Sequence, residues 1–170
     1  MRSKRICLLF LLLGVLLVSF GCARDEGDWF APFGAGFSAR IKGEWNGVAF
    51  EGTLQASAPG AQGEREMTLS FYAPSSLCGT EIFCGTDGSV TLCVQGFSVP
   101  VAGRAAQGYH SLFSLFSPTG GVREVVHEDG VTRVSGESFS LSFAADGTPL
   151  SLESSTVSVQ ILEWRSTENF

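Results

Sequence analysis

The sequence is poor in charged residues, proline and methionine, and these shortages narrow the class of protein. Charged residues make up 16% of its 170 residues and apolar residues 44%, so the chain is too apolar to be intrinsically disordered. It has 21 glycines and 14 phenylalanines against 6 prolines and 2 methionines. This balance favours short aromatic strands joined by tight turns over a bundle of helices.

Basic residues are scarce beyond the start of the chain. Three of the 11, Arg2, Lys4 and Arg5, lie in the first five residues, which leaves eight basic residues against 17 acidic ones. Recognition of nucleic acid needs a basic surface. The acidic balance therefore excludes a nucleic-acid partner.

The common catalytic and cofactor motifs are missing as well. The mature part of the chain has no G-x-S-x-G nucleophile motif, and no glycine-rich phosphate loop follows a strand. His110 lies between Tyr109 and Ser111, but adjacent residues rarely share a face, and Ser111 fits better as the N-cap of a helix that follows it. We expect no catalytic residue and no cofactor, and hence a protein that is not an enzyme.

The first 21 residues have the layout of an export signal. Arg2, Lys4 and Arg5 precede an apolar run over residues 6–20. A membrane-spanning helix is the alternative, but it needs about 20 apolar residues and this run has fifteen. We expect residues 1–21 to be a signal peptide.

Cys22 follows this run directly and is preceded by Gly21. The arrangement resembles the lipobox of bacterial lipoproteins, in which a cysteine after a small residue receives a diacylglyceryl group. Each buried acyl CH₂ contributes about 0.8 kcal/mol, so two palmitate-like chains hold a protein at a membrane. The resemblance implies a lipid anchor on Cys22 and a position at the cell membrane, on its extracytoplasmic side.

Three cysteines remain once Cys7 is assigned to the signal peptide and Cys22 to the lipid anchor. Cys78, Cys84 and Cys93 have the spacing C-x5-C-x8-C, which matches no C-x2-C zinc pattern, so we expect no metal site. Free thiols are the preferred interpretation. If Asp87-Gly88 is a two-residue turn, however, Cys84 and Cys93 become diagonal neighbours on one face, and a disulfide between them stays open.

The rest of the chain has the pattern of a series of hairpins. We expect residues 22–36 to be a tether with a single helical turn packed by Trp29 and Phe33. Residues 37–56 alternate strictly between apolar and polar side chains about Asn46-Gly47, a strong hairpin signal, and this register sets Gly43 opposite Phe50. Further turns are expected at Asp87-Gly88, Asp129-Gly130 and Asp146-Gly147.

One segment changes period. Leu112, Phe113, Leu115 and Phe116 form one apolar stripe, which predicts a helix over residues 109–117, ended by Pro118. We expect residues 37–170 to form a single, mainly β domain: an antiparallel meander of nine to eleven strands without a long crossover. So large a sheet must curl into a half-barrel, with the helix on its concave side.

Several short features carry a further resemblance. They are the anchored Cys22, the Phe-Ser-Ala that begins at Phe37, the segment Pro74-Ser-Ser-Leu77-x-Gly79, the central helix, and Asp146-Gly-Thr-Pro149. Together they resemble the LolA and LolB lipoprotein carriers and related lipoproteins. The resemblance implies a half-barrel that encloses an apolar cavity for acyl chains. The long N-terminal helix of the soluble carriers is missing here, and no position stands out as the arginine that grips the acyl chain in that family.

Two functions remain open. The first is an anchored lipoprotein that binds an apolar ligand or acyl chain on the concave face of the half-barrel. The second is an envelope lipoprotein with a structural or protein-interaction role and a fully packed core. An apolar cavity of several hundred Å³ would favour the first function, and a concave face filled by the helix would favour the second. The candidate lining residues are Phe50, Leu54, Phe71, Phe113, Phe116, Phe139, Leu141 and Phe143.

Overall fold

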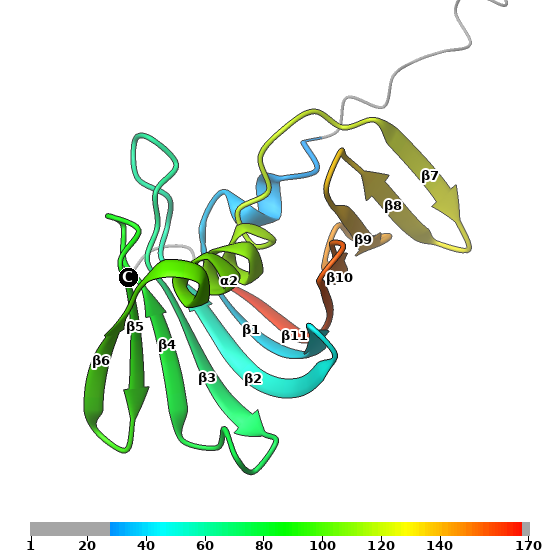
Figure 1. Ribbon diagram of the computed structural model, residues 1–170. Helices are drawn as coiled ribbons and strands as arrows, with labels where there is room; N and C mark the ends of the chain where they lie inside the picture. Colours follow the sequence, from blue (N-terminus) through cyan, green and yellow to red (C-terminus); the bar gives the residue numbers. More distant parts are fainter. Residues whose placement is uncertain (1–27, 168–170) are drawn as a thin grey trace, which may run out of the picture.

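The computed structural model describes residues 28–167, which form one curved antiparallel sheet wrapped around a single α-helix (Figure 1). The predicted half-barrel with a short helix is confirmed. The predicted signal peptide and Cys22 lie outside the described residues. The strands are β1 (Gly36–Trp45), β2 (Val48–Ala56), β3 (Met67–Ala73), β4 (Thr80–Cys84), β5 (Val90–Val94), β6 (Phe97–Val101), β7 (Glu124–Glu128), β8 (Val131–Ser135), β9 (Ser140–Ala144), β10 (Pro149–Glu153) and β11 (Val157–Thr167).

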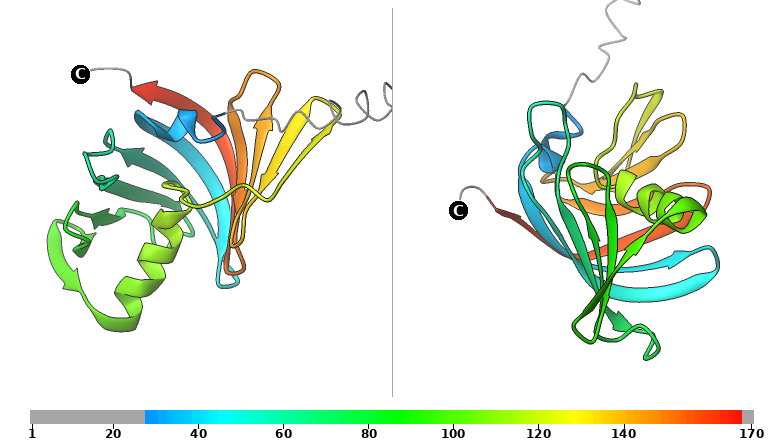
Figure 2. Two further views of the ribbon diagram at one scale, coloured as in Figure 1. Left: turned by 90° about the horizontal axis from the view of Figure 1, so that it is seen from above. Right: turned by 60° about the vertical axis from the view of Figure 1, so that its left-hand side comes forward.

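The order of the strands differs from a plain meander. It runs β6-β5-β4-β3-β2-β1-β11-β10-β9-β8-β7, so the two ends of the described chain meet in the middle of the sheet. The two edges, β6 and β7, are joined by a segment that contains the helix α2 (Gly103–Ser114). The expectation that no long crossover is needed was therefore wrong. This crossover places α2 on the concave side of the sheet (Figure 2).

The predicted helical turn before the sheet is confirmed as the 3-10 turn η1 (Ala31–Phe33). Phe33 is buried, with its ring 6.0 Å from that of Phe37 and 5.4 Å from that of Trp164. Trp29 lies 6.1 Å from Phe143 of β9. The turn thus covers the concave side of β9 and the start of β1.

The central hairpin has the predicted register, with Gly43 opposite Phe50 and Ile41 opposite Gly52. Both glycines are needed for close approach between strands. A Cβ on Gly52 would lie 2.5 Å from the backbone oxygen of Ser70, and a Cβ on Gly43 would collide with that of Ser158. Alternating large and small residues therefore let the sheet bend sharply at its centre.

Two of the four predicted glycine turns are two-residue hairpin turns. Asn46 and Asp129 have φ angles of 50° and 51°, and the glycine that follows each also has a positive φ. This pair of left-handed residues is the type I′ geometry, which matches the twist of the flanking strands.

The other two turns are wider than predicted. At Asp87-Gly88 and Asp146-Gly147 only the glycine has a positive φ. The backbone N–H of Ser89 donates to Asp87 Oδ1 at 2.8 Å, and that of Thr148 donates to Asp146 Oδ1 at 2.9 Å. The side-chain hydrogen bond to the backbone stabilises a longer loop in place of the two-residue turn.

This wider turn moves the cysteines apart. Cys84 pairs with Val90 and Cys93 pairs with Glu81, so the two cysteines point to opposite faces of the sheet. The diagonal arrangement expected for them was wrong, because it assumed a two-residue turn. All three cysteines within the described residues carry free thiols, with Cys78 exposed.

The helix starts six residues earlier than predicted and ends at Ser114. Its first half carries no apolar stripe, because it faces solvent, and so periodicity detected only the second half. Ser111 lies in the interior of the helix, where its Oγ donates to the backbone oxygen of Gln107 at 3.0 Å. Its assignment as an N-cap was therefore wrong; the N-cap is Ala102.

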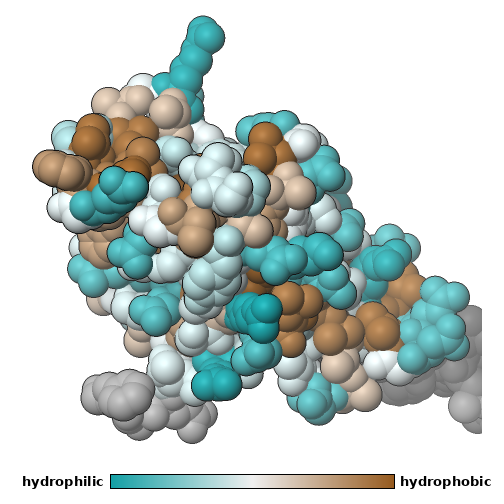
Figure 3. Space-filling model, turned by 90° about the horizontal axis from the view of Figure 1, so that it is seen from below, coloured by the Kyte–Doolittle hydropathy of each residue, from teal (hydrophilic) through white to brown (hydrophobic). Residues whose placement is uncertain are grey.

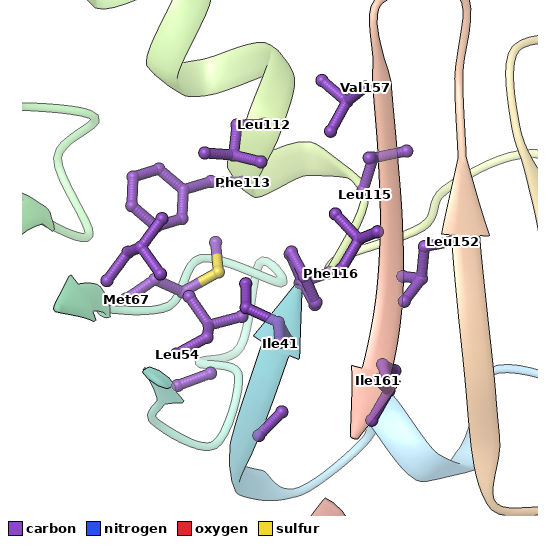
Figure 4. Packing of buried hydrophobic residues seen from close by; sticks show 14 of the residues in the cluster. Ile41, Leu54, Met67, Leu112, Phe113, Leu115, Phe116, Leu152, Val157 and Ile161 are labelled. Atoms are coloured by element: carbon purple, nitrogen blue, oxygen red, sulfur yellow. The ribbon is translucent and has the colours of Figure 1, made fainter. Parts of the chain in front are cut away.

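The core lies between the concave face of the sheet and the second half of α2. Four side chains at this end of the helix contact two groups of strand residues. They are Leu112, Phe113, Leu115 and Phe116, and they point toward Ile41, Leu54 and Met67 on one side and Leu152 and Val157 on the other (Figure 4).

Within residues 28–167, no helix has the length and apolar character that a membrane-spanning segment needs.

Candidate functional site

The eight predicted lining residues all lie on the concave side, in or beside one cluster. Phe50, Leu54, Phe71, Phe113, Phe116, Leu141 and Phe143 are buried, and Phe139 is half-buried against them. Phe113 of α2 and Phe116, which follows the helix, fill the space that a ligand would occupy. The structure therefore brings these residues together as packed core side chains.

Several hollows bounded by described residues lie around the edges of this cluster. One of about 320 Å³ borders it, between Trp29, Pro32 and Phe143. Two others, of about 500 and 510 Å³, lie on the outer, convex face of the sheet. The two hollows on the outer face are thus larger than the one beside Trp29.

One end of the concave face is left uncovered by α2. Val94, Phe97 and Val99 are 41%, 77% and 56% exposed. Val99 nevertheless continues the row of the buried Ile82, and Val94 and Phe97 continue that of the buried Thr80. Figure 3 shows apolar side chains gathered at the end of the molecule where β5 and β6 lie. We call Val94, Phe97 and Val99 the uncovered strip.

The edge strand β6, which carries Phe97 and Val99 of the strip, is blunted by Pro100. Pro100 pairs with Thr91, and its backbone faces the open edge of the sheet. A proline has no N–H to donate there. A peptide that added to this edge as a further strand would find one donor missing. The strip therefore suits apolar side-chain or acyl contacts better than strand addition.

A buried arginine is the most unusual feature of the concave side. Arg65 lies near the end of the loop between β2 and β3 and is only 6% exposed. Its Nη2 donates to the backbone oxygen of Phe33, and its guanidinium lies 5.5 Å from the centre of the Phe37 ring. The loop is closed behind it, because the N–H of Ser57 donates to the oxygen of Glu66 at 2.9 Å.

Arg65 has more donors than partners. Its Nε and Nη1 are buried and make no hydrogen bond within the described part of the chain. Burial lowers the pKa of Arg65 from its ordinary value, because desolvation disfavours the charged form. A buried cation with unused donors attracts an anionic or carbonyl oxygen.

Sequence reasoning missed Arg65. It stands between Glu64 and Glu66 in a polar, glycine-containing loop, and such a run predicts a solvated surface. Only the packing of η1 over the start of β1 encloses it. No local pattern in the sequence would have indicated this.

Cys84 and His110 also lie close together. Cys84 Sγ is 3.9 Å from His110 Nδ1, and this contact links β4 to α2. Burial, and next the negative charge of Asp87, raise the pKa of the Cys84 thiol. The nucleophilic thiolate is therefore disfavoured, and the contact serves packing.

Metal-ligating side chains are scattered over the molecule. Within residues 28–167, no three His, Cys, Asp or Glu side chains gather in a way that could hold a metal ion.

Comparison with known proteins finds similarity of fold. No protein-family model matches the sequence, and no curated protein matches it. An uncharacterised conserved protein from Thermus thermophilus has a TM-score of 0.50 and 14% identity, over 83% of this chain and 84% of that one. At this identity the likeness concerns the fold alone.

Two further solved structures have lower scores. A domain from Vibrio parahaemolyticus, described as an outer membrane lipoprotein-sorting protein, has a TM-score of 0.46 and 9% identity over 87% of this chain and 89% of that one. MucB has a TM-score of 0.46 and 14% identity, over 88% of this chain and 61% of its own.

Proposed function

We propose that this chain is a membrane-anchored, extracytoplasmic binding protein without catalytic activity, whose ligand is an acyl chain with an anionic or carbonyl head. The single observation that carries the proposal is Arg65, a buried guanidinium with two unpartnered nitrogens beside the aromatic cluster of Phe33, Phe37 and Trp164. The anchor is the lipid proposed on Cys22.

A ligand head would relieve the energetic cost at Arg65. An uncompensated buried charge destabilises a protein by several kcal/mol, and a carboxylate or ester oxygen at hydrogen-bond distance offsets this. The surrounding rings offer apolar surface for the first methylenes of the tail; Phe37 and Trp164 stack with their centres 4.2 Å apart. Arg65 is thus a candidate for the acyl-gripping role that the LolA resemblance implies.

The acyl tail of a ligand would need the space on the concave face that side chains of α2 and of the residues after it now fill. Phe113 and Phe116 occupy the concave side, so a bound chain would have to displace them. The helix α2 begins at Gly103, and the segment after it contains Gly120 and Gly121; none of these glycines has an atom within 4 Å of an added Cβ. Open, glycine-containing connections allow such a helix to shift.

The test uses a soluble chain that begins at Ala23, measured by native mass spectrometry and thermal unfolding. Palmitate is expected to bind and to raise Tm, since a ligand at 100 times its Kd stabilises by about 2.7 kcal/mol. Hexadecylamine, which has the same tail and a cationic head, is expected to bind more weakly because Arg65 repels it.

Arg65→Met separates a binding role from a structural one. The variant is expected to fold with equal or greater stability, because it removes a buried unpaired charge. It is also expected to lose the preference for palmitate over hexadecylamine. Arg123→Met, which removes an exposed ion pair with Glu137 at 2.6 Å, is the control and is expected to keep that preference. Equal binding of both probes by the unmodified chain would contradict the role of Arg65.

A protein-interaction role is the second candidate, and two observations favour it. The concave face is filled by core side chains, and the uncovered strip exposes Phe97 at the far side of the sheet from β7. If no lipid is carried through purification and palmitate leaves Tm unchanged, this candidate replaces the first.

A further inference from the structure

The outer face of the sheet carries a polar row that crosses seven neighbouring strands. Cross-strand pairing places its members directly beside one another from β11 to β6. The row contains hydroxyl, carboxylate, guanidinium and thiol groups. In order, it is Glu163, Arg40, Thr53, Ser70, Glu81, Cys93 and Ser98.

Two hollows lie along this row and meet at one aromatic residue. The first, about 500 Å³, is lined by side chains of β1, β2, β3 and β11, among them Arg40 and Glu51. The second, about 510 Å³, lies over β3, β4 and the β5–β6 hairpin and includes Glu81. Tyr72 lines both and is 53% exposed. We call the two hollows and Tyr72 the outer furrow.

The side chains of the furrow are held in place by one another. The hydroxyls of Thr53 and Tyr72 are hydrogen-bonded, which fixes the tyrosine ring. Glu163 lies 3.8 Å from Arg40 and 3.4 Å from Arg165. On the other side of Tyr72, Ser70 donates to Glu81 at 2.9 Å. Fixed polar groups reduce the entropy that a ligand would lose on binding.

The charge of the furrow argues for a neutral ligand. The first hollow has two arginines and two glutamates, and Glu81 is the one charged residue among those that line the second. Without an excess of basic groups, a phosphate or other polyanion gains little. An acyl chain is equally unsuited to the first hollow, because its lining side chains are all polar and would lose water without a partner.

The backbone of the sheet further limits which ligands the outer furrow can bind. On the face of a sheet the N–H and C=O groups are used in the ladder, so only side chains are offered to a ligand. Hydroxyl, carboxylate and guanidinium groups around an exposed aromatic ring match a ligand that has many hydroxyls and one apolar ring face. We infer that the outer furrow binds a neutral linear oligosaccharide, with a sugar ring stacked on Tyr72.

The dimensions agree with this ligand. Each hollow has about 500 Å³, which lies in the range of small-molecule sites. The two hollows therefore hold sugar rings on either side of Tyr72. This site is on the face opposite Arg65 and is independent of the proposed acyl site.

Isothermal titration calorimetry tests the inference on the full chain, kept in a detergent whose head group is not a sugar. The probes are cellotetraose, chitotetraose and maltotetraose. At least one is expected to bind with a Kd below about 10 mM. Tyr72→Ala is expected to weaken that binding at least about tenfold, because it removes the stacking surface.

Three further variants make the result specific. Tyr72→Phe keeps the ring and is expected to bind within about threefold of the unmodified chain. Thr53→Val removes the same hydrogen bond from its other partner and is expected to bind within the same range as Tyr72→Phe. Lys42→Ala, on the same face but outside the furrow, is expected to bind as the unmodified chain does. Binding of none of the three probes overturns the inference, and so does unchanged affinity in Tyr72→Ala.

Discussion

At the scale of the residue, two aspartates show how one side chain selects a turn. Asp87 and Asp146 each accept a hydrogen bond from the backbone N–H two residues later, in a turn wider than the Asn46-Gly47 hairpin. Asp129-Gly130, which Val131 follows, forms the tight turn. The wide turns have Ser89 or Thr148 at the corresponding position. The residue after the glycine is therefore part of the signal.

These hydrogen bonds also set acidity. The hydroxyl and then the N–H of Ser89 lower the pKa of Asp87, and the N–H and then the hydroxyl of Thr148 lower that of Asp146. A lowered carboxyl pKa adds stability above the ordinary carboxyl pKa. That contribution is lost as the pH falls through the lowered value.

Ser89→Ala tests this assignment. The variant removes the hydroxyl and keeps the N–H, so the pKa of Asp87 is expected to rise toward its ordinary value and that of Asp146 to stay unchanged. NMR titration of the two carboxyl groups measures both shifts in one sample. An unchanged pKa for Asp87 would show that its backbone contact alone is responsible.

At the scale of the element, α2 combines an exposed first half with a buried second half. Leu112 and Phe113 are fully buried, whereas Arg104 in the first turn is exposed. The helix begins at Gly103, and its N-cap residue, Ala102, makes no side-chain capping hydrogen bond. Its position therefore depends on packing against the sheet more than on its own local signals.

Phe113→Ala is expected to reduce the free energy of unfolding by about 3–5 kcal/mol, because it leaves a cavity beneath the helix. Arg104→Ala, on the exposed half of the same helix, is expected to change it by less than about 0.5 kcal/mol. Urea unfolding measures both. A loss near about 1 kcal/mol for Phe113→Ala would contradict this expectation and mean that α2 packs loosely against the sheet.

At the scale of the whole molecule, the pairing of β1 with both β2 and β11 joins the two halves of the sheet. Without the pairing of β1 with β11, β1–β6 and β7–β11 would be connected only through the crossover that contains α2. The long-range pair β1 and β11 runs from Gly36 opposite Thr167 to Trp45 opposite Val157. Each half therefore depends on the other for its core.

A chain that ends at Glu153 tests this dependence. It lacks β11, so the concave side chains of β1, including Ile41, lose their neighbours and the sheet has two new edges. We expect no cooperative thermal transition by circular dichroism. A chain that ends at Thr167 is the control and is expected to unfold in a single transition. Cooperative unfolding of the shorter chain would show that β1–β6 and α2 fold alone.

The sequence by itself determined the fold class, the turn at Asn46-Gly47, the pairing of Gly43 with Phe50 and the apolar stripe of α2. These follow from period, turn chemistry and residue size, which act over a few neighbouring residues. The tertiary structure alone decided the pairing of β1 with β11, the burial of Arg65 and the joining of two hollows at Tyr72. Each of these depends on segments far apart in the chain, and no local pattern specifies which distant segment a strand or loop will meet.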